Sequence, residues 1–499
     1  MSLSSAALIA QSGLAAVAAE TSVLSRNISG NSDTATYSLK IANVSTISNG
    51  AQVVSVTRAS NQAVFENVLS STAASATQDA ISSGLASLNQ TIGDVSSSAS
   101  GTSSASSPAA LLSDFANALQ SYEASPSDSS VAANAVSAAD AVASGLNSAS
   151  ATVQQVREQA DSGISASVQT INSLLRQFQT DNTQIANGSA TGADITDAQD
   201  KRDNILKQLS QQIGIVTTVG QNNDMSIYTD SGVTLFQGGV ARTVTFTPTN
   251  TYTSATVGNA VYVDGVPITG SSAAMPITSG ALAGLATLRD TVAVTYQAQL
   301  DNIAGALISN FSESDQVGAG PSLPGLFTTS GATSLPTSFT GLASEITVNA
   351  SVDPSQGGNA NLLRDGGISD TSNSNYTYNT SGNASYSGRL SELLNNLQAT
   401  QSFGSNGGII TSASLSSYAS ASVSWLEAER SQASSETSYQ DTLLSTATTA
   451  MSNATGVNLD DQMSKMLDLE NSYSASAKLI TAIDSMFRSL MTDIENIPA

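Results

Sequence analysis

Apolar residues recur in alternating steps of three and four at both ends of the chain. The N-terminal series runs from Leu3 to Ile28, and the C-terminal series runs from Leu459 to Ile497 over about five heptads. This spacing is typical of a coiled-coil seam. We therefore predict two terminal helices that pair through an assembly interface made by Leu3, Leu14, Val17, Leu24, Leu459, Met466, Leu469, Tyr473, Ile480, Ile483, Phe487, Leu490 and Ile494. The alternative is that each stripe is the core face of a globular bundle, because amphipathic helices share this spacing.

Between the ends, the helical period continues and then gives way to alternation. A shorter helical segment restarts at Leu112 and stops at Pro126, after a Ser-rich loop over residues 96–107. Turn residues Asp230-Ser231-Gly232 and Asp264-Gly265 predict hairpins. The other predicted helices cover 64–90, 130–187, 195–212, 281–311, 388–402 and 413–450, and the predicted strands cover 215–219, 225–228, 233–236 and 244–246.

These elements predict an α+β fold that is mainly α. The terminal coiled coil would comprise residues 1–45 and 455–499, and a helical rod or bundle would comprise 46–214, 281–313 and 388–454. A β-rich insertion over 215–280 and a polar Gly/Ser/Asn-rich outer insertion over 314–387 would project from the middle of the chain.

Composition excludes several classes of chemistry. The 499 residues include no His and no Cys, so imidazole-based nucleophile systems, imidazole or thiolate metal sites and disulfides are all excluded. No Lys follows a Gly, which excludes a phosphate-cradling loop. The net charge of -23 disfavours binding to nucleic acid. We expect no catalytic residue, no cofactor and no metal site.

The few charged clusters have simple explanations. Asp200, Arg202 and Asp203 form the densest one; we interpret it as a solvated helix face, with an ion-pair network at a domain junction as the alternative. Asp460 and Asp461 follow Asn458 at a helix start, where capping explains them better than acid–base catalysis does. The lone Trp425 is predicted to pack in the core.

Targeting signals are weak. No window of about 20 residues is apolar enough for us to expect a membrane span, and we expect no membrane insertion. Residues 2–19 carry no charge and lack the basic region of a secretory signal, because the first cation is Arg26. We interpret this segment as mature structure in a secreted protein that uses a route without a cleaved signal.

Several motifs resemble those of flagellar axial proteins. Residues 12–16 (SGLAA), 25–29 (SRNIS) and Tyr37 are similar to the opening SGLxA…SxNIAN…GY of rod, hook and hook-associated proteins. The departures are Ser29-Gly30 for the usual Ala-Asn and Thr36 for the usual Gly. Residues 456–461 (GVNLDD) resemble the start of the C-terminal helix that is shared across the class.

Interior motifs are more specific. Residues 112–115 (LSDF), 200–206 (DKRDNIL), 279–282 (SGAL) with 288–290 (LRD), and 300–304 (LDNIA) resemble the FlgK family, the hook-associated proteins of the first hook–filament junction. Residues 346–349 (ITVN) resemble a strand of that family.

The resemblance implies a structural subunit, not an enzyme. It would leave through the flagellar type III export channel and polymerise as a ring at the hook tip, where the extracellular flagellar filament is then assembled. Implied partners are further copies of the chain, the hook protein, a second junction protein and a flagellar export chaperone. Alternatives are another axial protein (hook protein, second junction protein or a flagellin-like subunit), a secreted adhesin using residues 328–410, or a carboxylate-based glycan hydrolase, which the scarcity of acids and aromatics in the insertions disfavours.

Overall fold

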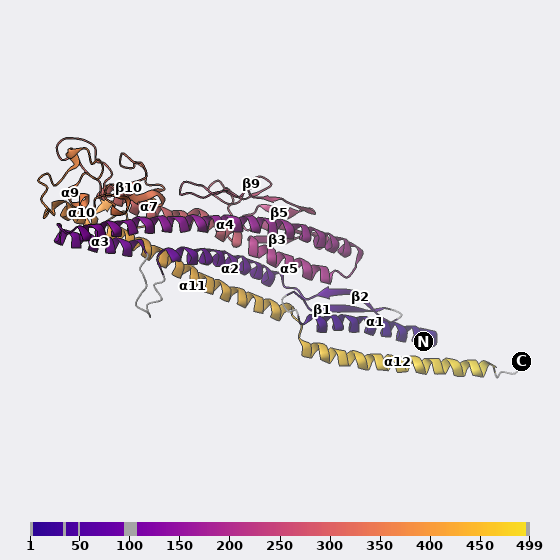
Figure 1. The fold of residues 1–499 in the computed structure, drawn as a ribbon. Helices are drawn as coiled ribbons and strands as arrows, with labels where there is room; N and C mark the ends of the chain where they lie inside the picture. Colours follow the sequence, from indigo (N-terminus) through magenta and orange to yellow (C-terminus); the bar gives the residue numbers. More distant parts are fainter. Residues whose placement is uncertain (1–2, 33–35, 48–49, 94–106, 496–499) are drawn as a thin grey trace.

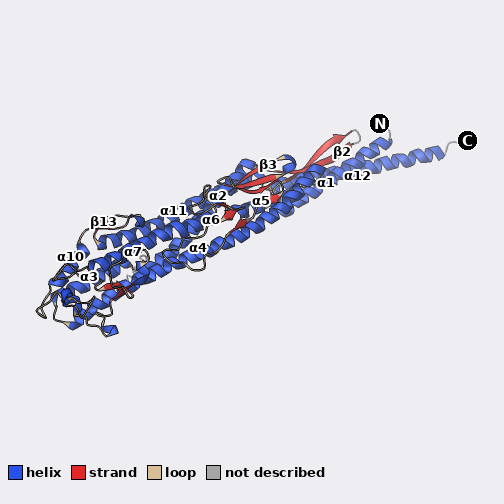
Figure 2. Ribbon diagram, turned by 90° about the horizontal axis from the view of Figure 1, so that it is seen from above, coloured by secondary structure: helices blue, strands red, loops and turns tan. Residues whose placement is uncertain are grey.

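The computed structural model describes residues 3–32, 36–47, 50–93 and 107–495. The molecule is an elongated helical rod (Figure 1), and the first and last helices lie together at one tip. Residues 350–400 lie at the opposite tip, and short strands lie along one side of the rod (Figures 1 and 2). The fold class predicted from the sequence, mainly helical with small β-rich insertions, is confirmed.

The predicted helices are present with bounds close to those expected. The helix expected over 281–311 is interrupted by one π-helical turn, Leu288–Val292. Of the Ser-rich loop, residues 96–106 lie outside the described residues. The helices are α1 (Leu3–Gly30), α2 (Gln62–Leu88), α3 (Pro108–Ala124), α4 (Ser129–Thr191), α5 (Thr196–Gln212), α6 (Ala281–Thr287), α7 (Ala293–Asn310), the short α8 (Leu342–Glu345) and α9 (Leu362–Asp365), α10 (Gly388–Gln398), α11 (Leu415–Thr455) and α12 (Leu459–Glu495).

Local sequence accounts for where the long central helix begins and ends. The Asp128 carboxylate accepts a hydrogen bond from the backbone N–H of Ser130 at 2.8 Å and caps the start of α4. The helix ends at Gly192, whose φ of 74° is a left-handed conformation that glycine adopts without steric cost. Between these caps, α4 runs for 63 residues and contacts α3, α5 and α7 in turn, so it is the spine of the rod.

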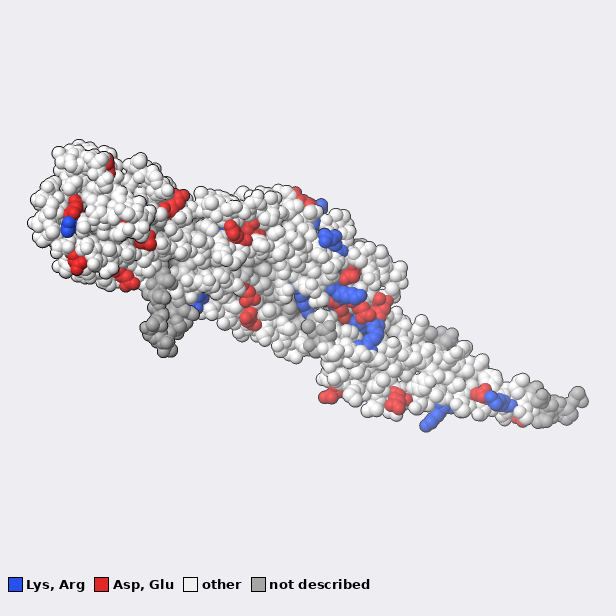
Figure 3. Space-filling model, in the orientation of Figure 1, with Lys and Arg blue, Asp and Glu red and all other residues white. Residues whose placement is uncertain are grey.

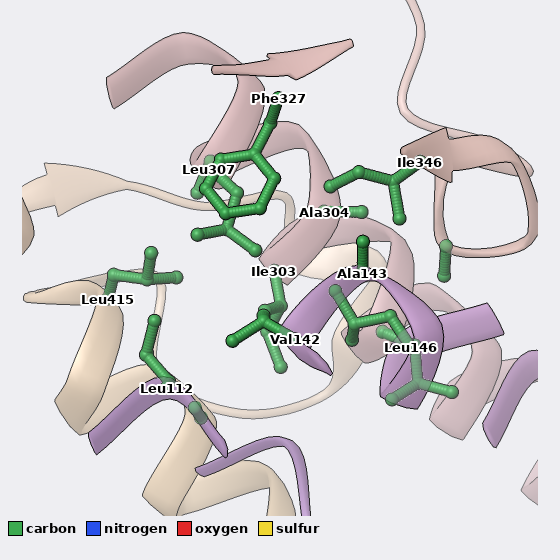
Figure 4. Packing of buried hydrophobic residues seen from close by; sticks show 14 of the residues in the cluster. Leu112, Val142, Ala143, Leu146, Ile303, Ala304, Leu307, Phe327, Ile346 and Leu415 are labelled. Carbon is green, nitrogen blue, oxygen red and sulfur yellow. The ribbon is translucent and has the colours of Figure 1, made fainter. Parts of the chain in front are cut away.

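Two apolar clusters fill the rod. The larger cluster lies where α3, α4, α7 and α11 meet (Figure 4), and it includes Phe327 and Ile346 from the segment that was expected to be a polar outer insertion. The ring of Phe327 packs edge-on against Phe115, with centroids 5.6 Å apart. Trp425 packs against this cluster and stacks on Tyr296 with centroids 6.4 Å apart, as predicted. Residues 314–387 are therefore partly built into the rod core.

The β-rich insertion is made of two small antiparallel sheets. One has the order β3 (Ile215–Val219), β4 (Met225–Thr229), β5 (Thr234–Gln237) and β6 (Val240–Ala241), and the other has β7 (Val244–Thr245), β8 (Tyr262–Val263) and β9 (Val266–Pro267). Asp264 and Gly265 turn between β8 and β9 with φ of 47° and 84°, as their sequence predicts. The ring of Phe236 in β5 packs edge-on against the ring of Phe178 in α4, with centroids 4.9 Å apart. This contact helps to hold the insertion against the rod.

The π-helical turn places a buried arginine inside the rod. Arg289 donates to Asp161 of α4 at 2.6 Å and to Asp290 at 2.8 Å, and its side chain is fully buried. Arg157, one turn before Asp161, donates to the carbonyls of Thr253 and Arg289. Burial lowers the pKa of Arg157, because a buried cation loses its hydration. The hydrogen bonds to the two carbonyls take the place of water. This network ties the loop around residue 253 to α4.

The described residues form three further strand pairs. β10 (Phe327–Thr329) pairs with β11 (Ile346–Val348), and β12 (Gln401–Ser402) pairs with β13 (Ser412–Ala413). The third pair, β1 (Lys40–Ile47) with β2 (Gly50–Arg58), is a hairpin that we did not predict from the sequence. It packs on α1, and the predicted domain boundary after residue 45 falls inside it. The division into domains stays a proposal.

Candidate assembly interface

The terminal helices α1 and α12 run antiparallel and contact each other along their length. Asn27 meets Gln462 near the start of α12, with the Asn27 amide donating to Gln462 Oε1 at 3.0 Å. Further along, a Cβ built on Gly13 would lie 3.9 Å from Ser476 Oγ. The small side chains of α1 therefore allow α12 to approach closely.

The residues predicted for the assembly interface divide into three groups in the single chain. Leu24 and Ile483 are buried between the helices, the latter only 3% exposed. A half-buried group comprises Leu3, Leu14, Val17, Met466, Leu469 and Ile480. An exposed group comprises Leu459, Tyr473, Phe487 and Leu490. The backbone of Ile494 is helical, and its side chain lies outside the described residues. That these residues form the assembly interface stays a prediction.

α12 exposes a second set of large apolar side chains that sequence analysis missed. They lie off the seam positions, and Met491, with 65% of its surface exposed, is the most accessible of them. The set comprises Met463, Leu467, Leu479, Met486 and Met491. A heptad search selects only the seam positions, so it passes over apolar residues beside them on the same helix, such as Met486 three residues after Ile483. Exposed apolar surface of this extent on one helix is typical of an interaction surface.

α1 is also more apolar than we expected. Contrary to the sequence expectation, it is long and apolar enough to cross a membrane by length and composition, which is weak evidence because core helices and signal sequences pass the same test. In the structure, α1 packs against α12 and against the hairpin β1–β2. Those contacts explain the apolar character of the faces that make them.

Asn27 of α1 forms hydrogen bonds to both β1 and α12. The sequence analysis included it in a motif but did not predict this role. Its side chain is 1% exposed. Its amide nitrogen donates to the carbonyl of Lys40 at 2.8 Å and to Gln462, and its carbonyl oxygen accepts from the backbone N–H of Lys40 at 2.9 Å and from the Tyr37 hydroxyl at 3.0 Å. An amide offers two donors and an acceptor with two lone pairs, so all of its capacity is used here.

A cluster of ion pairs connects this end of the molecule to the rod. Lys40 of β1, whose side chain is completely buried, lies 2.8 Å from both Asp197 and Asp200 of α5. Arg58 of β2 pairs with Asp200 at 3.0 Å and with Asp203 at 2.6 Å. Cations and carboxylates gather visibly at this junction (Figure 3), while most of the visible surface carries neither.

The expectation of a solvated helix face at this cluster is wrong. Asp200, Arg202 and Asp203 are all buried, and the alternative of an ion-pair network at a junction is correct. Arg202 points to the other side, donating to Asn182 of α4 and to the carbonyl of Asn223, and burial lowers its pKa to about 10. Their partners Lys40 and Arg58 lie far away in the sequence, so local spacing gives no sign of the network.

Burial and pairing shift the carboxylates in different directions. Burial raises the pKa of Asp203, although Arg58 and Arg202 oppose it. Burial also acts to raise the pKa of Asp197, but hydrogen bonds and charge attraction from Lys40 and Arg26 outweigh it and hold the pKa below its usual value. The pKa of Asp194 is also lowered: burial acts to raise it, but the pairing with Arg26 and the hydrogen bonds from Thr196 outweigh burial.

The start of α12 is capped as predicted. The Asn458 side chain accepts from the backbone N–H groups of Asp460 and Asp461, at 3.0 and 3.3 Å. Asp461 also pairs with Lys465 at 2.7 Å on the exposed face. Over the described part of the chain, no three acidic side chains are placed to hold a metal ion.

Comparison with known proteins gives this arrangement a class. Residues 95–323 match the family model of the flagellar hook-associated protein FlgK helical domain, and residues 449–493 match that of the flagellar basal body rod FlgEFG protein C-terminal segment. The first match includes all of α3, α4, α5, α6 and α7, and the second includes the end of α11 and most of α12. Two segments of the chain thus match family models of flagellar axial proteins.

Individual proteins are also similar to parts of the chain. Flagellar hook-associated protein 1 of Escherichia coli (strain K12) is 25% identical over 222 residues, which cover 44% of this chain and 40% of that protein. A solved structure of the flagellar hook junction protein FlgK from Burkholderia pseudomallei is 22% identical, with a TM-score of 0.41 over 53% of this chain and 46% of that one. The chain thus spans less than half the length of these relatives. The resemblance to the FlgK family that the sequence indicated is confirmed.

Proposed function

We propose that the chain is a structural, non-enzymatic subunit of the bacterial flagellum that polymerises at the hook–filament junction and is required for filament assembly. The observation that carries this proposal is the match of the rod to the FlgK helical domain, in a chain whose last helix exposes a long apolar surface. Within the part of the chain that the structure describes, the side chains of this surface are exposed to solvent. A neighbouring copy that buried this surface would gain about 1.5–3 kcal/mol for each large apolar side chain.

The mechanism we propose is polymerisation by layers. The α1–α12 pair forms the inner tube, the rod forms the next layer, and residues 215–280 and 314–387 lie outermost, as the domain division from the sequence has it. The elongated shape, with the terminal pair at one tip, supports this order. The net charge of -23 keeps unassembled subunits apart at low salt.

We propose as partners further copies of the chain in a ring at the hook tip, the hook protein, a second junction protein and a flagellar export chaperone. The site of action is extracellular, after export. We propose no nucleic-acid partner and no membrane insertion. The excess of acidic residues supports the first of these, because it repels phosphate backbones.

Deleting the gene tests this proposal. We expect cells that carry bare hooks and that shed flagellin into the medium, because filament subunits would find no junction on which to assemble. Re-expression of the chain should restore filaments. Normal filaments and motility in the deletion strain would contradict the proposal, and loss of the hooks as well would assign the chain to an earlier axial structure.

The adhesin alternative needs a different test from the one its sequence suggested. It treats residues 328–410 as a segment that could be removed without harm to the rod. Ile346, Leu363 and Leu393 of this segment are buried in the main core cluster, so deletion would destabilise the rod itself. Substitutions of exposed residues, such as Asn383→Ala with an attachment assay, test adhesion without this complication.

A further inference from the structure

The joint between the terminal section and the rod has no shared apolar core. We define the terminal section as α1, β1, β2 and α12, and the rod as the helices from α2 to α7 together with α11. Neither of the two apolar clusters of the rod includes a residue of the terminal section among the described residues. The chain crosses the joint twice, through residues 59–61 and 456–458. The joint is therefore held by short linkers and polar contacts.

The ion pairs across the joint form a ladder. Its three cations, Arg26, Lys40 and Arg58, all belong to the terminal section, and its four carboxylates belong to α5 of the rod and to the residues just before it. Arg26 lies 2.8 Å from Asp194 and 3.0 Å from Asp197; Lys40 follows with Asp197 and Asp200, and Arg58 follows with Asp200 and Asp203. Each cation thus spans two successive carboxylates.

The spacing of the carboxylates is regular. The acids at 194, 197, 200 and 203 follow one another every third residue, along the start of α5 and the residues just before it. At a rise of 1.5 Å per residue, neighbouring carboxylates on a helix are separated by about 4.5 Å along its axis. A shift of that size would carry two of the three cations from their present carboxylates to the next pair, while the cation at the end of the series keeps one of its two carboxylates.

We propose that this ladder is a charge-latched hinge, which holds the terminal section at one tilt on the rod and admits a second tilt by moving the cations one carboxylate along. An apolar interface would resist such a movement, because close-packed side chains interlock. Lys40 is the central rung, since it is fully buried and its backbone is bound to Asn27. Docking of α12 through Asn27 is thereby coupled to the latch.

The absence of cysteine from the chain makes the hinge measurable. Spin labels on Thr180→Cys of α4 and Ser474→Cys of α12, both exposed positions, report the distance between rod and terminal section in the full chain. We expect a narrow distance distribution in the otherwise unaltered chain. Asp200→Asn, which weakens the ion pairs with Lys40 and with Arg58, should broaden the distance distribution or add a second population. Asp264→Asn, which alters the exposed pair with Arg242 at 3.3 Å away from the joint, is the matched control and should leave the distribution unchanged.

Two further measurements separate the latch from general unfolding. Trp425 packs against the main core cluster of the rod, so its fluorescence reports whether the rod of each variant melts at the same temperature as that of the parent chain. If Asp200→Asn lowers the melting temperature of the rod, Arg26→Gln tests the hinge instead. Arg26 is partly exposed, and its replacement leaves the buried ion pairs of Lys40 and Arg58 intact. An equally narrow distribution in Arg26→Gln and Asp200→Asn would overturn the proposal, as would a broad distribution in the parent chain.

Discussion

Asn27 and Gln462 are joined by a hydrogen bond of 3.0 Å although 435 positions separate them in the sequence. Both side chains are almost fully buried. Since the same Asn27 side chain also binds both polar groups of the Lys40 backbone, one residue fixes the first helix, the first strand and the last helix together.

Replacing Asn27 should release the last helix from the first. In Asn27→Leu, the Lys40 backbone, Tyr37 and Gln462 lose their partner, and each buried polar group left unpaired costs about 1–3 kcal/mol. We expect faster hydrogen exchange and faster proteolysis in α12, with the rod unchanged. Asn43→Ala is the control, because the Asn43 amide binds Ser55 and Thr57 on the exposed side of the hairpin. Equal protection of α12 in both variants would show that Asn27 does not hold this helix.

Substitutions at buried positions of the α1–α12 contact and at exposed positions of α12 should have different effects. Leu14→Asp or Ile483→Asp places an unpaired charge against the partner helix, so the α1–α12 pair should loosen and assembly should fail. Met486→Asp alters an exposed side chain, so the pair should stay intact while assembly still fails. Helical content and sedimentation measure the two properties. Glu470→Gln, an exposed and charge-reducing change, should assemble normally; normal polymers from Met486→Asp would remove that face from the interface.

The three phenylalanines of the main core should be needed for rod stability. Phe115, Phe311 and Phe327 pack with ring centroids between 5.2 and 5.6 Å apart, and all are buried. Phe115→Ala should therefore lower the free energy of unfolding by about 3–5 kcal/mol. Denaturant titration measures this loss. Val257→Ala, at a side chain that is 82% exposed, should change it by no more than about 0.5 kcal/mol; similar values for both would contradict the core assignment.

The buried pair of Asp161 and Arg289 should also be sensitive to change. Asp161→Ala leaves Arg289 with Asp290 as its remaining carboxylate and removes the acceptor of Tyr252 and of the Thr249 N–H, whose bonds to Asp161 are 2.7 and 2.8 Å long. We expect a loss of about 3–5 kcal/mol in unfolding free energy, as is usual when one member of a buried pair is removed. Proteolysis should then begin in the loop around residue 253. Resistance of that loop in Asp161→Ala would show that the pair does not anchor it.

Acid should loosen the joint. The pKa values of Asp194 and Asp197 are lowered in the folded chain, so their contribution to stability is present above the ordinary carboxylate value of 3.8 and is lost as pH falls below it. Asp203 has a raised pKa and contributes with the opposite sign, since its folded state binds the proton more readily. The distribution of spin-label distances between rod and terminal section should therefore broaden as the pH falls below about 4. Broadening already near neutral pH would contradict this account.

Most of the helical framework could be predicted from local sequence. The central helix expected over 130–187 is observed over 129–191, because its period, its Asp128 cap and its Gly192 stop are all local signals. The turn at Asp264 and Gly265 was predictable for the same reason. The hairpin β1–β2 was missed since it is a two-stranded ribbon whose position depends on packing against α1.

The polar parts of the site could not be predicted in the same way. Whether a carboxylate such as Asp200 is solvated or buried depends on Lys40 and Arg58, which the fold brings from distant positions. The segment over 314–387 was expected to be outermost because of its composition, yet it sends Phe327 and Ile346 into the rod core. A few apolar residues are enough to anchor a polar segment to the core. The average composition of the segment does not reveal them, so it gave no sign of this packing.

The position of the protein on the flagellum tests the central claim most directly. Gold-labelled antibody against the chain, viewed by electron microscopy on intact flagella, should mark a single band where the hook meets the filament. Label spread along the hook, along the filament or over the cell surface would contradict a junction subunit.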